Sequence, residues 1–421
     1  MVSRDRVEWQ AMKHLLTLQI CKPCTLLLTV LITCISVTHA SAPEAAPTER
    51  ALTLTTSVLD DSLKKQLQSC ATADFYATDF AIAHRGAPLG YPEHSREGYT
   101  AAAKQGAGII ECDVTFTKDL ELVCRHSQCD LATTTNILQT PLAAKCSKPF
   151  QPANGQRPAS ATCCTSDITL TEFKTLCARP DRSNKKAKTL DEFLVPLMSD
   201  VVSSPLACGR LVTHAESIEL INTLGRKFIP ELKRPEVAMP FAEGFDQAAY
   251  ADKMLAEYRS AGIAPKRVFP QSFDLRDVWH WIENHPDFAE QVVWLDPRGR
   301  QRSFRSSPSN FEELKAKGLN RIAPPLPMLL TLNDQGKIIP SAYAIQAKAA
   351  GLDIITWTFE SGNPTDPNNW LYASIAEAMS TPGQMLEALH VLAKDVGVKG
   401  VFADWPGTVT YYANCLLEPG A

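Results

Sequence analysis

The feature that most constrains the fold is an alternation of short apolar runs with amphipathic segments along most of the chain. Strands alternating with helices form a parallel sheet. At 421 residues, a closed (β/α)8 barrel, or TIM barrel, is favoured over an open sheet. Strands are expected at residues 80–85, 108–114, 120–126, 227–233, 267–273, 291–295, 353–359 and 400–404, with helices at 95–106, 245–262, 345–351 and 384–396 among others.

A cysteine-rich region interrupts this alternation between residue 127 and about residue 189. It is rich in Pro, Ser, Thr and Ala, which is not typical of a barrel core. With Cys208 just after it, its six thiols can pair in 15 ways. We expect an insertion after an early strand, stapled by disulfides, in which Cys163 and Cys164 reach different partners. The other cysteines of this region are Cys129, Cys146 and Cys177.

The N-terminal segment has the features of a targeting sequence. Residues 25–37 are apolar, basic residues precede them and small residues follow them. This stretch has the length of a signal-peptide core and is too short for a comfortable membrane span. We expect residues 1–42 to be a signal peptide, starting at Met1 or Met12, with an uncleaved anchor as the alternative. Residues 43–70 then form a lead-in, and residues 71–421 the barrel.

The number of cysteines agrees with export to an oxidising, extracellular location. Thirteen are present, and those outside the targeting segment are even in number. Cys70 precedes the first barrel strand and Cys415 follows the last, so barrel closure favours a bridge between them. Cys112 and Cys124 are expected on opposite faces of the sheet and unpaired with each other.

Overall charge limits the partners. The formal net charge is −4, so no broad basic surface is expected to bind nucleic acid or anionic lipid. No membrane span is expected in the mature chain.

Three carboxylates are expected at one end of the barrel. Glu111 and Asp113 are two residues apart on one strand and share a face, and Glu231 ends another strand. The C-terminal ends of the strands surround the active site of such barrels. Buried carboxylates repel one another unless a cation binds them, and three oxygen donors suit Mg²⁺ or Ca²⁺. The alternative is that they form ion pairs with Arg85 and Lys233.

Two histidines, His84 and His126, end strands near the same mouth. Histidine gives or takes a proton near neutral pH. A lone histidine is usually a core residue, but the neighbouring carboxylates weaken that interpretation. Arg85 and Lys233 add cations suited to phosphate. Together these residues indicate phosphate-ester chemistry.

The same residues resemble the signature of the glycerophosphodiester phosphodiesterase family. The resemblance runs from about residue 80 to residue 406, and the family also carries an insertion after its early strands. It rests on His84-Arg85-Gly86, Pro92-Glu93, Glu111-X-Asp113, Thr117-Lys118-Asp119, Leu122-Val123, His126, Glu231-X-Lys233, Trp357-Thr358 and residues 400–406.

The resemblance implies a metal-dependent enzyme that cleaves small-molecule glycerophosphodiesters to sn-glycerol 3-phosphate and an alcohol, such as choline or ethanolamine. Attack would come either from the glycerol 2-hydroxyl, through a cyclic phosphate, or from water. The implied roles are metal ligands for Glu111, Asp113 and Glu231, an acid/base pair for His84 and His126, phosphate binding for Arg85 and Lys233, and pocket lining for Glu93 and Trp357.

The sequence departs from the family pattern at two places. Ser127 stands where the family usually has Asp, which would lower activity if that Asp supports the histidine or the metal. His94-Ser95 replaces the usual Asn-Thr, and we interpret His94 as loop filler rather than as a pocket residue. Two alternatives stay open: a phospholipase D or sphingomyelinase D-like enzyme on the same barrel, and a catalytically weakened binding protein.

Overall fold

The computed structural model describes residues 47–194, 208–300 and 310–417. They belong to one unit that runs from Ala45 to Ala421. The expected signal peptide, residues 1–42, lies outside the described residues. Within the described ranges, no helix combines the length and the apolar character needed to cross a bilayer.

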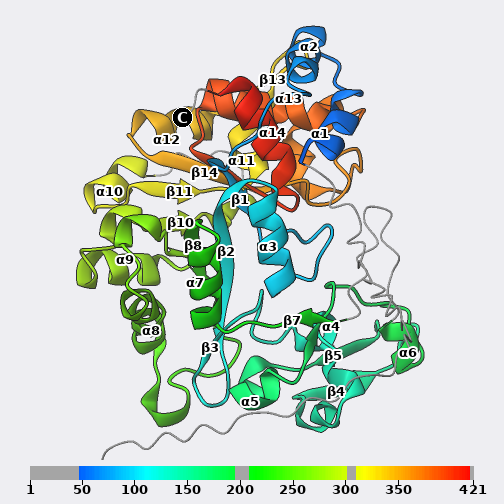
Figure 1. Ribbon diagram of the computed structural model, residues 1–421, viewed down its shortest axis with the longest axis vertical. Coiled ribbons are helices and arrows are strands. Elements are labelled where there is room, and N and C mark those ends of the chain that lie inside the picture. The colour runs from blue at the N-terminus through cyan, green and yellow to red at the C-terminus, as the bar shows by residue number, and fades with distance from the viewer. Residues whose placement is uncertain (1–46, 195–207, 301–309, 418–421) are drawn as a thin grey trace, which may run out of the picture. The chain divides into compact units, whose positions relative to one another are not determined.

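Eight parallel strands close into a barrel, so the expected fold is confirmed (Figure 1). β1 pairs with both β2 and β15, and these pairings complete the ring. The barrel strands, in order around the ring, are β1 (Thr78–Ala83), β2 (Ala107–Phe116), β8 (Lys227–Leu232), β9 (Gln271–Ser272), β10 (Val293–Leu295), β11 (Arg321–Ala323), β14 (Asp353–Phe359) and β15 (Gly400–Ala403).

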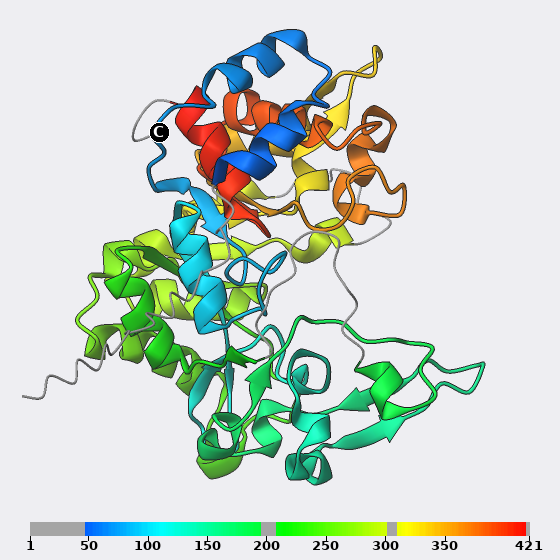
Figure 2. The same ribbon diagram turned by 45° about the vertical axis from the view of Figure 1, so that its right-hand side comes forward.

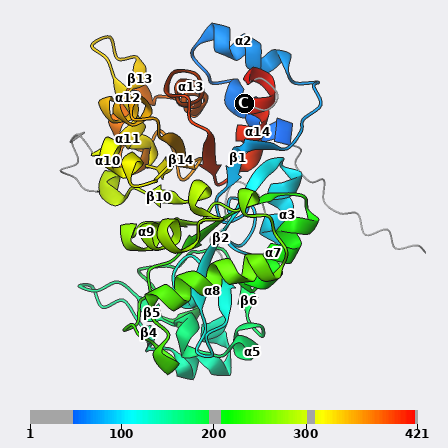
Figure 3. The same cartoon turned by 90° about the vertical axis from the view of Figure 1, so that its left-hand side faces the viewer.

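Helices cover the outside of the barrel, and Figure 3 shows α7, α8 and α9 along one side of it. Ser95, Thr213 and Asp246 begin α3, α7 and α8 by accepting hydrogen bonds from backbone N–H groups of the first turn. These outer helices are α3 (Arg96–Lys104), α7 (His214–Thr223), α8 (Gln247–Ser260), α9 (Leu275–Asn284), α10 (Phe311–Ala316), α11 (Leu326–Leu329), α12 (Ala342–Ala349), α13 (Gln384–His390) and α14 (Pro406–Leu416). A short hairpin of β12 (Leu330–Leu332) and β13 (Ile338–Pro340) follows α11.

The expected lead-in forms two helices, α1 (Pro47–Thr55) and α2 (Asp61–Ser69). They bury apolar side chains such as Leu54 and Leu67 and lie against α14, as the blue and red ribbons of Figure 2 show. The predicted bridge between Cys70 and Cys415 is present, with the Cα atoms 5.7 Å apart. Residues 47–70 are therefore packed onto the barrel.

The strand expected at residues 120–126 is not a barrel strand. β3 (Leu122–Cys124) runs antiparallel to β2 and flanks it. The turn between them is tight: Leu120 has a φ of 63°, and Oγ1 of Thr117 donates to Asp119. A parallel neighbour would need a crossover of about a dozen residues or more, which this turn does not provide. β11, which the sequence pattern missed, supplies the eighth barrel strand.

Cys112 and Cys124 form a disulfide, so the prediction that they do not pair is wrong. The antiparallel register places Cys124 opposite Val114, which shares a face of β2 with Cys112. The two cysteines are diagonal neighbours on that face, and their Cα atoms are 5.4 Å apart. The prediction took the face of Cys124 from that of His126, but β3 ends at Cys124 and its alternation does not extend further.

The cysteine-rich insertion has a small core of its own, which includes Ile137, Phe173 and Phe193. It extends past residue 189, because a disulfide joins Cys177 to Cys208 beside the last of its strands. As expected, its six cysteines pair with one another: Cys129 with Cys164, Cys146 with Cys163, and Cys177 with Cys208. Its helices and strands are α4 (Leu131–Thr134), β4 (Lys148–Gln151), β5 (Ser160–Thr162), α5 (Leu170–Phe173), β6 (Cys177–Ala178), α6 (Leu190–Phe193) and β7 (Gly209–Arg210).

Inward-facing side chains change from apolar to polar along the barrel strands. On β2, Ile109 belongs to the apolar interior, and Glu111 and Asp113 follow it on the same face. On β8, Ile229 belongs to that interior and Glu231 follows it in the same way. The interior therefore ends in a layer of carboxylates at the C-terminal ends of the strands, where barrel active sites lie.

Candidate active site

The three carboxylates expected to bind a cation lie together at the mouth of the barrel. Glu111 and Asp113 come from β2, and Asp113 is the direct register partner of Glu231 on β8. All three side chains are buried, and one oxygen atom of each lies within 4.8 Å of the other two. The sequence prediction that these acids converge agrees with this arrangement.

Two neighbouring groups hold Glu111. Nε2 of Gln271 on β9 donates to Oε1 of Glu111 at 2.9 Å, and the backbone N–H of Arg85 donates to Oε2 at 2.9 Å. Gln271 was not among the predicted site residues. Its place near the end of an expected strand is the sequence signal that would have suggested it.

Arg85 and Lys233 pair with the acids, as the alternative interpretation of the sequence expected. Nζ of Lys233 lies 2.6 Å from Oε1 of Glu231, and Nε of Arg85 lies 3.6 Å from Oδ2 of Asp113. Arg85 also donates from Nη1 to Oε1 of Glu93 at 3.0 Å. Four carboxylates, including Glu111, thus face two cations. If all ionise, an excess of two negative charges remains.

The pKa values respond to this imbalance. Burial raises the pKa of Glu111 well above its ordinary value, and the charges of Asp113 and Glu231 raise it further. Burial also raises the pKa of Glu231, to about 7, against the opposing effect of Lys233. Burial would raise the pKa of Asp113 as well, but Lys233 and His94 outweigh it and lower that pKa. Full ionisation of the three therefore requires more positive charge than the side chains supply.

These observations fit a hard divalent cation. All three donors are oxygens, which Mg²⁺ and Ca²⁺ prefer. Oδ1 of Asp113 is buried and accepts no hydrogen bond from the described part of the chain. A divalent cation would balance the excess negative charge and coordinate Oδ1 of Asp113.

His94 supports the carboxylate group from behind. The side chain is fully buried, its Nε2 lies 2.9 Å from Oδ2 of Asp113, and its Nδ1 lies 2.9 Å from the hydroxyl of Tyr99. Our interpretation of His94 as loop filler does not agree with this geometry. The sequence contained no sign of the contact, because Asp113 and Tyr99 meet His94 only through the fold.

His84 is oriented by a residue that the sequence analysis did not assign. Nδ1 of His84 lies 2.5 Å from Oδ1 of Asp404, which directly follows β15, the ring neighbour of β1. A carboxylate at Nδ1 fixes the tautomer and leaves Nε2 for proton transfer. The sequence signals of Asp404 were its position at the end of an expected strand and its place in residues 400–406, which resemble the family's closing strand.

His126 is mostly buried and lies near Arg85 and Lys233. Burial lowers the pKa of His126, and the charges of Arg85 and Lys233 lower it further, so the imidazole is neutral near pH 7. Ser127, which stands in place of the family's Asp, borders the cavity next to it.

Most of the predicted site residues line an open cavity of about 1400 Å³. Asp113 and Glu93 are not among its lining residues. Asp113 instead contacts Arg85 and Lys233, and Glu93 orients Arg85. Phe273, Trp357 and Trp370 give the cavity an apolar part, with ring centroids 5.7 Å apart in each neighbouring pair. The predicted residues that line it are His84, Arg85, Glu111, His126, Glu231, Lys233 and Trp357.

The match to known families decides the class of protein. Residues 84–408 match the model of the glycerophosphoryl diester phosphodiesterase family. The chain belongs to this family. The match spans the site from His84 to Asp404 and confirms the resemblance found in the sequence. A member of this family is a phosphodiesterase for a small-molecule glycerophosphodiester, and neither alternative drawn from the sequence is favoured.

Several relatives share part or most of the chain. A protein of Arthroderma benhamiae named Extracellular protein is 38% identical over 243 residues, which cover 56% of this chain and 98% of the relative. Glycerophosphodiester phosphodiesterase GDPD6 of Arabidopsis thaliana is 22% identical over 348 residues, which cover 79% of this chain and 85% of that protein. Probable glycerophosphodiester phosphodiesterase 1 of Mycobacterium tuberculosis is 49% identical over 49 residues, which cover 12% of this chain and 18% of that protein.

A solved structure supports the fold. The chain is similar to a candidate glycerophosphoryl diester phosphodiesterase of Silicibacter pomeroyi, with a TM-score of 0.54 and 18% identity, over 83% of this chain and 98% of that one. At this identity the likeness bears on the barrel architecture alone.

Proposed function

We propose that the protein hydrolyses glycerophosphodiesters to sn-glycerol 3-phosphate and an alcohol, with Mg²⁺ or Ca²⁺ held by Glu111, Asp113 and Glu231. The observation that carries this proposal is the buried group of three carboxylates at the cavity, which together with Glu93 outnumbers the cations Arg85 and Lys233 by two. When bound, the cation would polarise a phosphoryl oxygen and offset its charge.

Arg85 and Lys233 bind the phosphodiester in this proposal. Both border the cavity, and carboxylates hold both in place. A guanidinium matches two phosphate oxygens at once, whereas an ammonium acts as a point charge. The neighbouring aromatic side chains, with Trp357 among them, contact the less polar alcohol part.

The two histidines divide the proton transfers. His126 is neutral, so it accepts the proton of the attacking hydroxyl. His84 donates from Nε2 to the leaving alcohol oxygen, and Asp404 stabilises its charged form through Nδ1. The attacking hydroxyl is either the glycerol 2-hydroxyl, which gives a cyclic phosphate first, or water.

We also propose that the protein works outside the cell. All ten cysteines that follow the N-terminal segment form the five disulfides described above, and disulfides persist mainly in oxidising compartments. The Arthroderma benhamiae relative is named an extracellular protein. N-terminal sequencing of secreted material would test cleavage after Ala40 or Ala42.

Product analysis tests the reaction. The disulfide-intact protein is incubated with glycerophosphocholine and Mg²⁺ or Ca²⁺, and ³¹P NMR follows the phosphorus. The proposal predicts sn-glycerol 3-phosphate and free choline, with a transient cyclic phosphate if the 2-hydroxyl attacks. Release of phosphocholine, or cleavage of lysophosphatidylcholine alone, would contradict it.

A further inference from the structure

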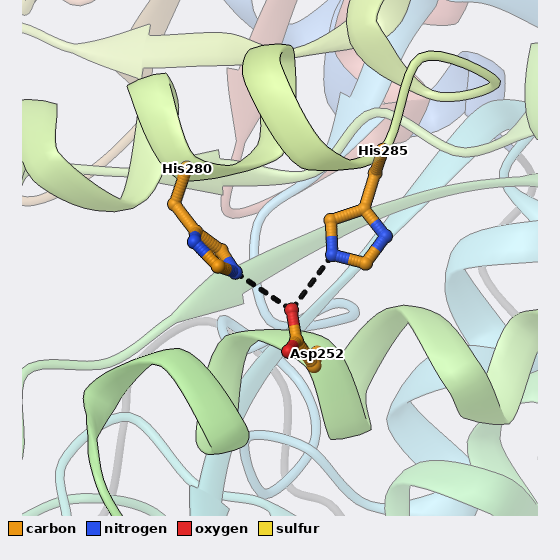
Figure 4. Close-up of side chains that lie close together, drawn as sticks. All are labelled: Asp252, His280 and His285. Atoms are coloured by element: carbon orange, nitrogen blue, oxygen red, sulfur yellow. Dashed lines mark hydrogen bonds and ion pairs between the residues drawn. The ribbon is translucent and has the colours of Figure 1, made fainter.

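A second group of potential metal ligands lies on the outer helices, away from the cavity. Asp252 is on α8, His280 is on α9, and His285 follows the last turn of α9. Figure 4 shows both imidazole rings directed at the carboxylate of Asp252. None of the three lines the cavity or has a role in the proposed reaction.

We propose that Asp252, His280 and His285 bind a zinc-class ion that ties α8 to α9. Nε2 of His280 and Nε2 of His285 both lie 2.7 Å from Oδ1 of Asp252. The three ligand atoms lie within 4.8 Å of one another. Two imidazoles and one carboxylate with space for water are a frequent ligand set for Zn²⁺.

The donor types separate this site from the one in the barrel. The barrel group offers only oxygen atoms, which suit Mg²⁺ or Ca²⁺. Two imidazole nitrogens instead favour Zn²⁺, Cu²⁺ or Ni²⁺. The protein would therefore bind a Mg²⁺- or Ca²⁺-class ion in the barrel and a Zn²⁺-class ion between α8 and α9.

The space around the ligands permits coordination. Tetrahedral Zn²⁺ keeps its ligand atoms about 3.3 Å apart, so the carboxylate must withdraw by roughly half an ångström. The Asp252 side chain is 50% exposed on the helix surface, which allows that movement. The same exposure lets water supply the fourth ligand.

Arg259 sets the tautomer of His285 and opposes binding. Its Nη2 lies 2.9 Å from Nδ1 of His285, and Asp287 holds the guanidinium through two contacts, at 2.8 and 3.1 Å. Arginine can only donate, so Nδ1 must accept and the ring proton must sit on Nε2. Coordination through Nε2 requires that proton to move to Nδ1, and Arg259 must then turn away.

His280 has a more adaptable neighbour. Nδ2 of Asn284 lies 3.3 Å from Nδ1 of His280. A side-chain amide can turn and present its oxygen instead, which accepts from an Nδ1–H group. Arg259 is thus the group that limits the affinity, and its removal should strengthen the site.

Calorimetric titration of the disulfide-intact full chain with ZnCl₂ tests the proposal. The wild-type protein should bind one equivalent that His280→Gln/His285→Gln abolishes and that Glu231→Gln leaves intact. Arg259→Met, which retains packing over Phe288, should bind it about 10-fold more tightly. His390→Gln is the matched control, because His390 belongs to no group of three potential ligands in the described part of the chain.

Two further readouts separate a site from a simple hydrogen-bonded contact. Co²⁺ on the unaltered chain should give the strong visible absorption of tetrahedral nitrogen ligation. Zn²⁺ should raise the melting temperature of the wild type but not of Asp252→Asn. The same Zn²⁺ affinity in wild type and in the double histidine variant, or no such Co²⁺ absorption, would overturn the proposal. Glycerophosphocholine hydrolysis should not change in the double variant, so this result is independent of the proposed function.

Discussion

Nε2 of the fully buried His94 lies 2.9 Å from Oδ2 of Asp113. Burial lowers the pKa of His94, so the ring is neutral and has one proton to donate to the carboxylate. The hydroxyl of Tyr99 then donates to Nδ1, 2.9 Å away. This chain of hydrogen bonds fixes one member of the carboxylate group without contact with the cavity.

His94→Ala should therefore weaken divalent-cation binding by about 10–100-fold, the usual effect of losing a partner of a metal ligand. The turnover number at saturating cation should fall much less. His94→Asn, which restores the residue that the family usually has, should retain more affinity than the alanine variant. Calorimetric titration with Ca²⁺ measures this, and equal affinities in the three proteins would return His94 to a filler role.

The histidine pair should act as one unit. His84→Ala and His126→Ala should each lower the turnover number by about 10²–10⁴, and the double variant should lose less than the product of the two. Asp404→Asn should lower turnover in the wild type but add little to His84→Ala, because Asp404 acts through His84. Steady-state kinetics on glycerophosphocholine measure all five variants, including Asp404→Asn combined with His84→Ala. Near-normal turnover in either single histidine variant would assign that residue to the core.

Removing the cation should make stability fall as pH rises. The folded-state pKa of Glu231 is about 7 against an ordinary 4.5, and that of Glu111 is also raised. Between these values the folded protein binds more protons than the unfolded chain, so its stability decreases with increasing pH. With a chelator, the melting temperature should drop between about pH 5 and pH 7.5, and saturating Ca²⁺ should remove the drop. Glu231→Gln should reduce it, and an unchanged drop in that variant would contradict the assignment.

The insertion should depend on its disulfides more than the barrel does. Its core is small, and two of its bridges span 35 and 31 residues, worth about 3–4 kcal/mol each in the loop-entropy account. Partial reduction followed by limited proteolysis should cut the insertion before the barrel melts. As a control, Cys70→Ser/Cys415→Ser should lower the barrel melting temperature and leave the insertion resistant. Unfolding of the insertion and the barrel together on mild reduction would argue against this order.

The sequence predicted the barrel because local patterns determine strands and helices. It predicted the convergence of Glu111, Asp113 and Glu231 because parallel strands bring their C-terminal ends to one mouth. It failed at β3, where a short turn reverses the chain, and therefore at the bridge from Cys112 to Cys124.

The contacts that support the site could not be predicted in the same way. Asp404 meets His84 only because the barrel closes, and Gln271 meets Glu111 only through strand order. His94 reaches Asp113 from the loop before α3, where its backbone N–H donates to the carbonyl of Arg85. Each contact joins residues that are far apart in sequence or belong to irregular segments, where neither periodicity nor spacing carries a signal.

Chelation and add-back test the central claim most directly. The activity of the purified protein on glycerophosphocholine is measured with excess chelator, then after return of Mg²⁺ or Ca²⁺, alongside Asp113→Asn and Glu231→Gln. The account predicts that chelation abolishes turnover, that the cation restores it in the wild type, and that neither variant recovers at the same concentration. Full activity in excess chelator, or full recovery of both variants, would contradict a cation held by these carboxylates.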